Sequence, residues 1–338
     1  MAKTIHHRAT RADVAKEAGT SVAVVSYVVN NGPRPVAPAT RERVLAAIKS
    51  TGYRPNSVAR ALASGTTKTY GLVVPNIGNA FIASLAHELQ QQALANDMVM
   101  LLGDAGDSRK RELQLINNLL SQQVNGLFYI SVDRHPYIDV LKSSGTPFVM
   151  LDRVDPGLPV SVIRVDERAA SHQVTAHLLS HGYQEVGIIC GPAEMLNTQD
   201  RLRGWRDALA EYGVEERPEW IFHTPYTRDG GYQAAQRMMQ GATRPRALFA
   251  SNEAQAVGCI RALAEQAIRV PDQLALVCFN GTDQSAYHVP SLTTVRQPVR
   301  KMAETAIQML AAWRGEETLT EFSHHLELGE SCGCKPEK

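Results

Sequence analysis

The sequence lacks a long apolar stretch: no hydrophobic run approaches the ~20 residues that a helix needs to cross a bilayer. Its N-terminal residues contain no apolar segment typical of a secretory signal, so we expect a cytoplasmic protein with no membrane partner. Cysteine is scarce as well. Five cysteines are scattered over 338 residues. An odd, scattered set argues against a disulfide framework and indicates free thiols in a reducing compartment.

The motifs of common enzyme classes are also missing. The sequence contains no GxGxxG or GxxxxGK[ST] phosphate loop, no GxSxG nucleophile elbow and no HExxH zinc motif. We therefore expect no enzyme, no cofactor and no catalytic residue. Cys332 and Cys334 lie one residue apart near His324 and His325. This pattern lacks the fixed spacing of metal ligands, so it predicts two unpaired thiols and no metal site.

Charge is distributed unevenly along the chain. Residues 1–65 contain ten Lys and Arg against three acids, a net charge of +7, whereas the remaining residues contain 25 cations and 31 acids, a net charge of −6. A small basic module on a mildly acidic body suggests a polyanionic partner for that module alone. On charge alone, a solvated basic face is the alternative.

The first sixty residues predict short helices. Thr10 and Asp13 have capping-box spacing, Gly19 ends this helix, and Ser21 caps the next one. The turn residues 30–33 stop the second helix, and a third follows. Two helices joined by a short Gly-containing turn, with a supporting third, are typical of a helix-turn-helix.

From residue 70 onward, short apolar strands alternate with amphipathic helices. Such alternation predicts an α/β fold with parallel sheets covered on both faces, and about eight strands indicate two sub-domains. In such sheets, ligands bind beyond the carboxyl ends of the strands. The predicted strands span residues 71–76, 98–104, 126–132, 147–153, 186–191, 220–226, 247–252 and 274–280.

Two groups of motifs carry a family resemblance. Before residue 66, DVA, AGTS, VS..VN, TR..V, GY.PN and A..L occur in that order. This part resembles the DNA-binding headpiece of the lactose-repressor/galactose-repressor (LacI/GalR) family. The remainder contains GLVVPNIGNAF, RLRGW, ALFASNEAQAVGCIRAL and SLTTVRQP. It is similar to that family's effector-binding core, which resembles periplasmic sugar-binding proteins.

The resemblance implies a domain organisation. The helix-turn-helix headpiece would span residues 1–65, with a hinge helix at about 55–64, and the core of two parallel-sheet sub-domains would span 66–338. Sub-domain 1 would comprise about 69–162 plus 294–322, and sub-domain 2 about 163–292 plus 324–338. The crossovers would lie near 161–165, 291–294 and 322–325. A homodimer would bind a near-palindromic double-stranded DNA operator.

The resemblance also assigns DNA-binding residues in the headpiece. The second helix would enter the major groove, where Val22 and Ala23 lack hydrogen-bonding groups but can contact a thymine methyl. Simple helix packing is the alternative for these two. Leu62 occupies the family's minor-groove wedge position, with core packing as its alternative. The assigned set is Thr10, Arg11, Ser21, Val22, Ala23, Ser26, Tyr27, Asn30, Arg54, Asn56, Ala59 and Leu62, with Arg41 as a further phosphate contact.

An effector pocket is implied by the same spacing, lined by Asn79, Phe81, Asp104, Tyr129, Arg201, Tyr226, Asn252 and Asn280. Phe81 and Tyr226 could stack on a ring or belong to the core, and Arg201 could fork onto a ligand or form a surface salt bridge. The strand that ends at Asn280 lacks the family's usual aspartates. Because Arg201 then has no evident counter-charge, the sequence predicts a sugar-like effector carrying an anionic or carbonyl group.

The resulting hypothesis is a ligand-responsive, sequence-specific transcription regulator of repressor type. A small-molecule carrier or chemoreceptor on the same core is the alternative from another class, and the basic headpiece disfavours it. An enzyme is the third alternative and has no motif in its support.

Overall fold

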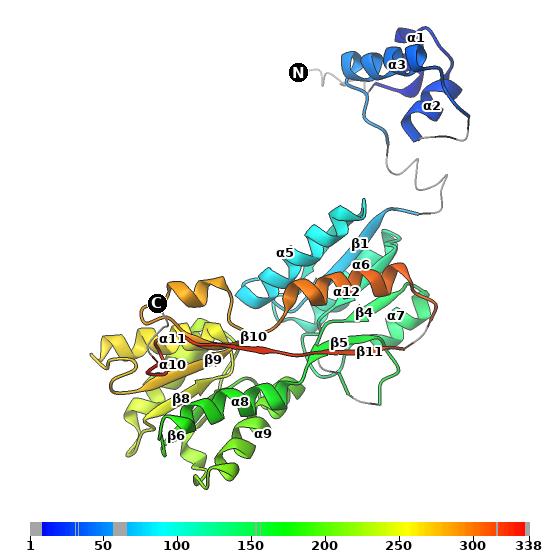
Figure 1. Cartoon of the computed structure of the whole chain (residues 1–338). Coiled ribbons are helices and arrows are strands. Elements are labelled where there is room, and N and C mark those ends of the chain that lie inside the picture. Colours follow the sequence, from blue (N-terminus) through cyan, green and yellow to red (C-terminus); the bar gives the residue numbers. More distant parts are fainter. Residues whose placement is uncertain are drawn as a thin grey trace, which may run out of the picture. The chain divides into compact units, whose positions relative to one another are not determined.

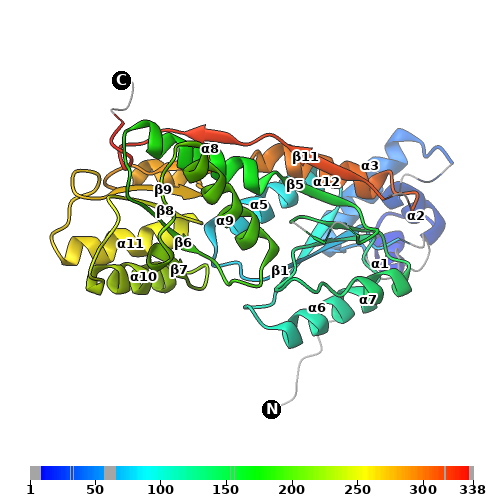
Figure 2. The same cartoon turned by 90° about the horizontal axis from the view of Figure 1, so that it is seen from below.

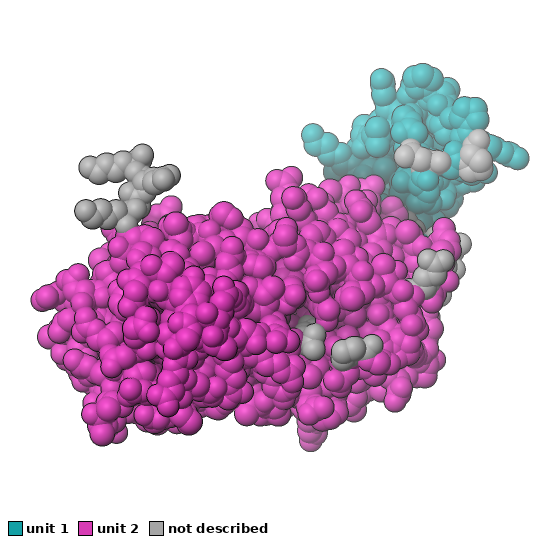
Figure 3. Space-filling view, turned by 60° about the horizontal axis from the view of Figure 1, so that its bottom comes forward, with its two compact units in different colours: residues 1–67 teal, residues 68–338 magenta. Residues whose placement is uncertain are grey.

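The computed structural model describes residues 9–30, 32, 34–56, 66–152, 154–155, 157–315 and 317–334. The chain divides into two compact units, residues 1–67 and 68–338, coloured separately in Figure 3. The first unit is a small helical domain, and the second is an α/β domain with two sheets (Figure 1). Within the described residues, no helix is both long enough and apolar enough to span a membrane.

The described residues of the first unit contain three helices: α1 (Arg11–Glu17), α2 (Val22–Asn30) and α3 (Pro38–Thr51). Helix α1 contacts both of the others. Short aliphatic side chains fill the space between them, because helices this short must approach closely to exclude water. The buried core residues are Val14, Ala15, Ala18, Val25, Val28, Val44, Ala47 and Tyr53.

The predicted helix ends of this unit are confirmed. The backbone N–H of Thr10 donates to Asp13 Oδ2 at 2.8 Å, and the Asp13 N–H donates to Thr10 Oγ1 at 3.3 Å, which completes the capping box. Ser21 Oγ accepts from the N–H of Val24 at 3.3 Å, directly before α2. Helix α3 ends at Gly52, whose φ of 65° lies in the left-handed region that glycine adopts without strain.

One sheet of the second unit has the strand order β11-β5-β4-β3-β1-β2, and all its pairs are parallel. Helices α5 and α12 cover one face, and α6 and α7 cover the other (Figure 2). We call this sheet and its helices sub-domain 1. Its elements are β1 (Thr69–Val74), α5 (Ala80–Ala95), β2 (Val99–Asp104), α6 (Arg109–Ser121), β3 (Gly126–Tyr129), α7 (Ile138–Ser144), β4 (Phe148–Met150), β5 (Val162–Val165), α12 (Val299–Ala311) and β11 (Leu319–Phe322).

The other sheet, in sub-domain 2, has the order β12-β10-β9-β8-β6-β7, and only β12 runs antiparallel. Helices α8 and α9 pack together on one face and α10 and α11 on the other. Its elements are α8 (Glu167–Ser180), β6 (Val186–Cys190), α9 (Leu196–Glu211), η1 (Pro218–Trp220), β7 (Ile221–His223), α10 (Arg228–Gln240), β8 (Ala247–Ala250), α11 (Glu253–Glu265), β9 (Ala275–Phe279), η2 (Asp283–Tyr287), β10 (Thr293–Arg296) and β12 (His325–Glu327).

Every predicted strand overlaps an observed one, and four further strands lie where the chain passes between the sheets. The passages follow β5, β10 and β11. Two predicted sub-domain boundaries fall inside strands. Strand β5 (Val162–Val165) pairs with β4 and β11, so the chain leaves sub-domain 1 after Val165. Strand β10 (Thr293–Arg296) pairs with β9, so the chain returns to sub-domain 1 after Arg296. Short strands buried on both faces show little alternation, so the pattern alone did not mark these ends.

Candidate functional site

The outward face of α2 carries the residues predicted to read DNA. Val25 and Val28 are buried in the helical core and Val24 and Val29 pack partly against it, so the exposed side chains lie at the N-terminal turn of α2 and at Asn30. Val22 is 47 % exposed, an unusual position for a large aliphatic side chain. On this face Ser21, Val22, Ala23 and Asn30 are exposed, and Ser26 and Tyr27 are half-buried.

Two contacts order this face. Asn30 Nδ2 donates to Ser26 Oγ at 3.2 Å, one turn apart on α2. Tyr27 lies against Gly32, where an added Cβ would come within 2.6 Å of the Tyr27 ring. Only a glycine lets the chain pass so close to the ring, so this contact fixes the ring's position at the end of α2.

The other headpiece residues predicted to bind DNA lie outside α2. Arg11 Nε donates to the Tyr53 hydroxyl at 3.2 Å, so this predicted phosphate contact also joins α1 to the segment after α3. Arg54 and Asn56 are exposed, and Thr10 is the helix cap described above. Ala59 and Leu62 lie outside the described residues.

A cavity of about 810 Å³ lies in the second unit, with walls from both sub-domains. This volume suits a small molecule. Its polar lining comes from loops that follow strands of both sheets, among them β1, β3, β4, β8 and β9, and from the N-terminal turns of α8, α9 and α10. The cavity therefore occupies the carboxyl edge of both sheets, as parallel topology favours.

Six of the eight predicted pocket residues line this cavity. Phe81 and Tyr226 supply aromatic surface, and Asn79 is the N-cap of α5, where its Oδ1 accepts from the N–H of Phe81 at 3.0 Å. The six are Asn79, Phe81, Arg201, Tyr226, Asn252 and Asn280. Asp104 and Tyr129 are not among the lining residues.

Asp104 instead fastens a loop. Its Oδ1 accepts from the backbone N–H of Gly106 at 3.0 Å and of Ile77 at 3.3 Å, which ties the turn after β2 to the turn after β1. Asp107, three residues further on, lines the cavity. Spacing within the chain did not distinguish these two aspartates because both follow the same strand.

Tyr129 belongs to the core. Side chains alternate along β3, so Phe128 and Ile130 face α5 and α12 while Tyr129 faces α6 and α7. Its hydroxyl donates to the buried carboxylate of Glu112 at 2.8 Å. Burial, followed by the Glu112 charge, raises the pKa of Tyr129 well above its usual range.

Arg201 has the counter-charge that the sequence did not reveal. Its Nε donates to Glu167 Oε2 at 2.5 Å and its Nη1 to the Ser251 carbonyl at 2.5 Å, and both charged side chains are buried. Burial alone would lower the pKa of Arg201, but the adjacent Glu167 carboxylate outweighs burial and raises that pKa above its ordinary value. The prediction of an uncompensated Arg201 is therefore wrong, and the argument for an anionic effector loses its premise.

Hydrogen bonds also fix the wall around Tyr226. The hydroxyls of Tyr226 and Thr198 share a hydrogen bond at 2.7 Å, and Tyr226 donates to Asn197 Oδ1 at 3.2 Å. Asn252 is the N-cap of α11, and its Nδ2 donates to the Tyr226 carbonyl at 3.1 Å. Burial raises the pKa of Tyr226 to about 12, so its phenol stays protonated and can serve a ligand as a neutral aromatic surface.

The residues after β9 that differ from the family's usual aspartates have a structural explanation. Asn280 has a φ of 60°, a conformation that asparagine tolerates, and its Oδ1 accepts from Gln297 Nε2 at 2.6 Å. At Gly281 an added Cβ would lie 2.1 Å from Thr294. Glu253 is buried and accepts from Thr282 and Ser285, so it holds the turn rather than a ligand.

The cavity walls carry more acid than base. Three arginines line it, but six carboxylates do, and Glu167 is already paired with Arg201. An anion entering this cavity would meet net repulsion, whereas hydroxyl groups could donate to the carboxylates. The charged lining residues are Asp107, Asp133, Asp152, Arg164, Glu167, Glu194, Arg201, Arg228 and Asp229. Sequence reasoning missed most of these because neither the loop residues nor those on β5, α8 and α10 belong to a motif.

Comparisons with known proteins agree with this architecture. Residues 10–56 match the family described as bacterial regulatory proteins, lacI family, and residues 175–329 match the periplasmic binding protein-like domain. Catabolite control protein A of Priestia megaterium is 31 % identical, with the alignment covering 94 % of this chain and 98 % of that protein.

Two solved structures are similar over nearly the whole chain. The lac repressor dimer bound to operator and the anti-inducer ONPF has a TM-score of 0.83 at 25 % identity, covering 96 % of this chain and 99 % of that chain. The complex of transcriptional regulator CelR with cellobiose has a TM-score of 0.71 at 28 % identity, covering 96 % and 100 %. This chain therefore belongs to the LacI family of bacterial regulatory proteins, whose members are DNA-binding transcription regulators rather than enzymes.

Proposed function

We propose that this regulator acts as a dimer on a near-palindromic DNA operator and that a neutral, sugar-like effector in the 810 Å³ cavity controls its affinity for that operator. One observation carries the proposal: a single chain joins a helix-turn-helix unit, with an exposed face on α2, to a separate unit with a cavity.

The headpiece would bind through charge and shape. Lysine and arginine of the +7 segment would neutralise phosphates, and the N-terminal turn of α2 would enter the major groove. Val22 and Ala23 offer methyl groups and no hydrogen bonds, so they would favour thymine, whose methyl lies in that groove. Tyr27 supplies a phenolic hydroxyl on this face, beside the hydroxyls of Ser21 and Ser26.

An exposed apolar strip supports the dimer. Strand β2 is the edge of its sheet, yet Val99, Leu101 and Leu102 are 61 %, 39 % and 49 % exposed, and Leu94 at the end of α5 is 65 % exposed. An edge strand with this much exposed aliphatic surface favours a protein interface. A second copy of the chain could cover it.

The effector chemistry follows from the walls of the cavity. Its carboxylates and asparagines suit hydroxyl groups, and Phe81 and Tyr226 suit the apolar face of a sugar ring. The similar structure of CelR is a complex with cellobiose, a neutral sugar. A ligand that contacts both walls would favour one relative orientation of the sub-domains, and the three strand passages supply the hinge.

The salt dependence of DNA binding tests the first half of the proposal, that the headpiece binds operator DNA. For the full chain, log affinity for operator-containing DNA should fall linearly with log salt, with a slope of about −0.9 per phosphate neutralised. Replacing the exposed Arg54 by Gln should reduce the slope by about one phosphate, whereas Lys301→Gln, an exposed cation on α12, should leave it unchanged. A flat salt response would contradict the proposal.

Calorimetric titration tests the second half with matched pairs, each a sugar and its acid or phosphate. The neutral member should bind more tightly, and only that member should change operator affinity. Tighter binding of the anionic member would contradict the charge argument and leave the DNA-binding result untouched.

A further inference from the structure

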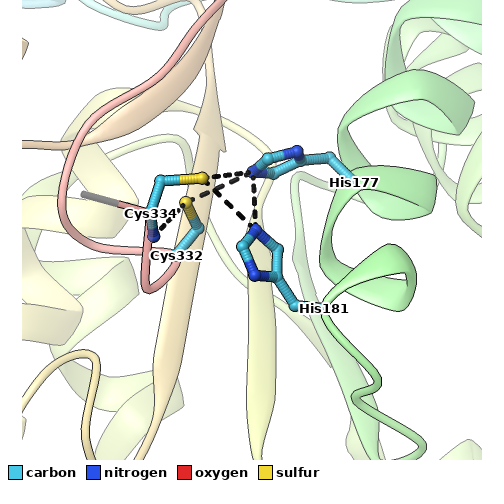
Figure 4. A group of neighbouring side chains, drawn as sticks. All are labelled: His177, His181, Cys332 and Cys334. Atoms are coloured by element: carbon cyan, nitrogen blue, oxygen red, sulfur yellow. Dashed lines mark hydrogen bonds between the residues drawn. The ribbon is translucent and has the colours of Figure 1, made fainter. Parts of the chain in front are cut away.

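Two histidines and two cysteines that are far apart in the sequence come together at the edge of sub-domain 2. His177 lies in the last turn of α8 and His181 is the residue that caps it, so both rings project from one side of the helix. Cys332 and Cys334 come from the C-terminal segment after β12. Figure 4 shows the four side chains converging, and their ligand atoms all lie within 4.8 Å of one another.

The backbone holds the two thiols in place. The hydroxyl of Ser331 donates to the Leu276 carbonyl at 2.6 Å, and the N–H of Leu276 donates to the Ser331 carbonyl at 2.8 Å, so the segment is bound to β9. Gly333 between the cysteines has a φ of 97°, which is strained for any other residue. This glycine allows both thiols to face α8.

Four of the six distances between the ligand atoms lie within about 0.4 Å of tetrahedral values. Zinc bonds of about 2.0–2.1 Å to nitrogen and about 2.3 Å to sulfur place two nitrogens about 3.3 Å apart and a nitrogen and a sulfur about 3.6 Å apart. His177 Nε2 and His181 Nε2 lie 3.3 Å apart. Cys334 Sγ lies 3.6 Å from His177 Nε2 and 3.3 Å from His181 Nε2, and Cys332 Sγ lies 3.2 Å from His177 Nε2.

Hydrogen bonds also hold the sulfur of Cys332 in place. Thr293 Oγ1 donates to Cys332 Sγ at 3.0 Å, and the backbone N–H of Cys334 points at the same sulfur at 3.5 Å. Contacts of this kind orient the residues that bind a metal.

We propose that His177, His181, Cys332 and Cys334 bind one zinc ion and thereby join the C-terminal segment to the end of α8. Two imidazoles and two thiolates complete four-coordinate zinc and leave no open position, which is typical of a structural site. The four residues do not line the effector cavity, so the ion is distinct from the effector. The expectation of two unpaired thiols considered only neighbours in sequence, and α8 supplies the partners.

Cobalt substitution tests the site in the full chain without any variant. The chain, purified in reductant and stripped with a chelator, is titrated with Co²⁺. We expect intense tetrahedral d–d absorption and thiolate-to-cobalt charge transfer that saturate at one equivalent and disappear on addition of Zn²⁺. Zinc in excess should also raise the Tm by several degrees, since it binds the folded state.

Substitutions of the two more exposed ligands test whether these residues bind the ion. His181→Ala and Cys334→Ser replace an exposed and a half-buried side chain, so both should fold. Loss of a supporting hydrogen bond weakens metal sites about 10- to 100-fold, so loss of a ligand should weaken zinc binding by ~100-fold or more. The matched control is His172→Ala on the same helix, whose ring contacts Glu211 and not the cluster, and it should bind zinc unchanged.

Three results would overturn the proposal. The first is a reduced chain that binds no Co²⁺ at concentrations that saturate ordinary zinc sites. The second is a charge-transfer band of unchanged intensity in Cys334→Ser, because that variant keeps only the Cys332 thiolate. The third is a Cys332–Cys334 disulfide in chain isolated under reducing conditions, detected as a mass two protons lower, because it would consume both thiolates.

Discussion

The two units of this chain present their candidate sites in opposite ways. In the headpiece, several residues predicted to bind DNA are exposed on α2 or cap a helix, and local contacts such as Thr10 with Asp13 and Asn30 with Ser26 hold them, apart from the contact of Arg11 with Tyr53. In the core, Arg201 contacts Glu167 and Ser251, which are 34 and 50 positions away. A surface site follows from helix periodicity, whereas a cavity is built from partners that the sequence does not bring together.

The difference has an energetic side. Glu167, Arg201, Asn252 and Asn280 of the cavity wall are buried, and they stabilise the sub-domain as well as lining the ligand space. Exposed residues of α2 contribute little to folding and are available to DNA. Substitutions should therefore lower stability in the core and change binding in the headpiece.

The largest effect is expected for Arg201→Met. Removing Arg201 leaves the buried Glu167 carboxylate without its partner, and breaking such a pair costs about 3–5 kcal/mol in unfolding free energy. Urea denaturation followed by circular dichroism measures it. Arg203→Met, on the same helix with its side chain 54 % exposed, is the control and should change stability by less than about 1 kcal/mol. Equal effects of the two substitutions would remove the contrast between the units.

Leu62→Ala should act on binding alone. If the family's wedge role applies, operator affinity falls by about 10- to 100-fold, equivalent to about 1.4–2.7 kcal/mol, because the kinked DNA step loses its support. Core stability and effector affinity should stay the same. Leu45→Ala, an exposed leucine of α3, is the matched control in gel-shift titrations. Unchanged operator affinity of Leu62→Ala would exclude Leu62 from the DNA-binding set.

The variant Tyr129→Phe tests whether Tyr129 belongs to the core or to the effector cavity. The Glu112 carboxylate loses a buried hydrogen bond, so we expect the unfolding free energy to fall by about 1–2 kcal/mol with effector affinity unchanged. Tyr226→Phe is the counterpart within the cavity, and it should change effector affinity. A weakened effector titration for Tyr129→Phe would return Tyr129 to the ligand site.

The smallest effect is expected for Thr10→Ala, which removes the cap of α1 and should destabilise the headpiece by about 1 kcal/mol. Thr10→Ser retains the capping hydroxyl and is the control. The measurement is the thermal transition of the headpiece in the full chain. If both variants melt alike, the capping box does not stabilise this unit.

The sequence predicted the secondary structure better than the site. Alternating apolar strands and helices located the sheets, because each element must bury its own apolar face. Of the pocket residues, those placed correctly follow buried strands or open helices, as Asn252 and Asn280 do. Tyr129 was placed wrongly because a one-residue step along a strand reverses the face, and a spacing match does not show which face is the core.

Local chemistry alone determined the helix caps and the exposed face of α2, because these depend on residues within one or two turns. The tertiary structure alone decided the ion pair of Arg201 with Glu167 and the meeting of His177 with Cys332, 155 positions away. Such contacts arise when the order of strands in a sheet sets which helix lies beside which segment. That order follows from the packing of the whole domain, and no stretch of the sequence specifies it alone.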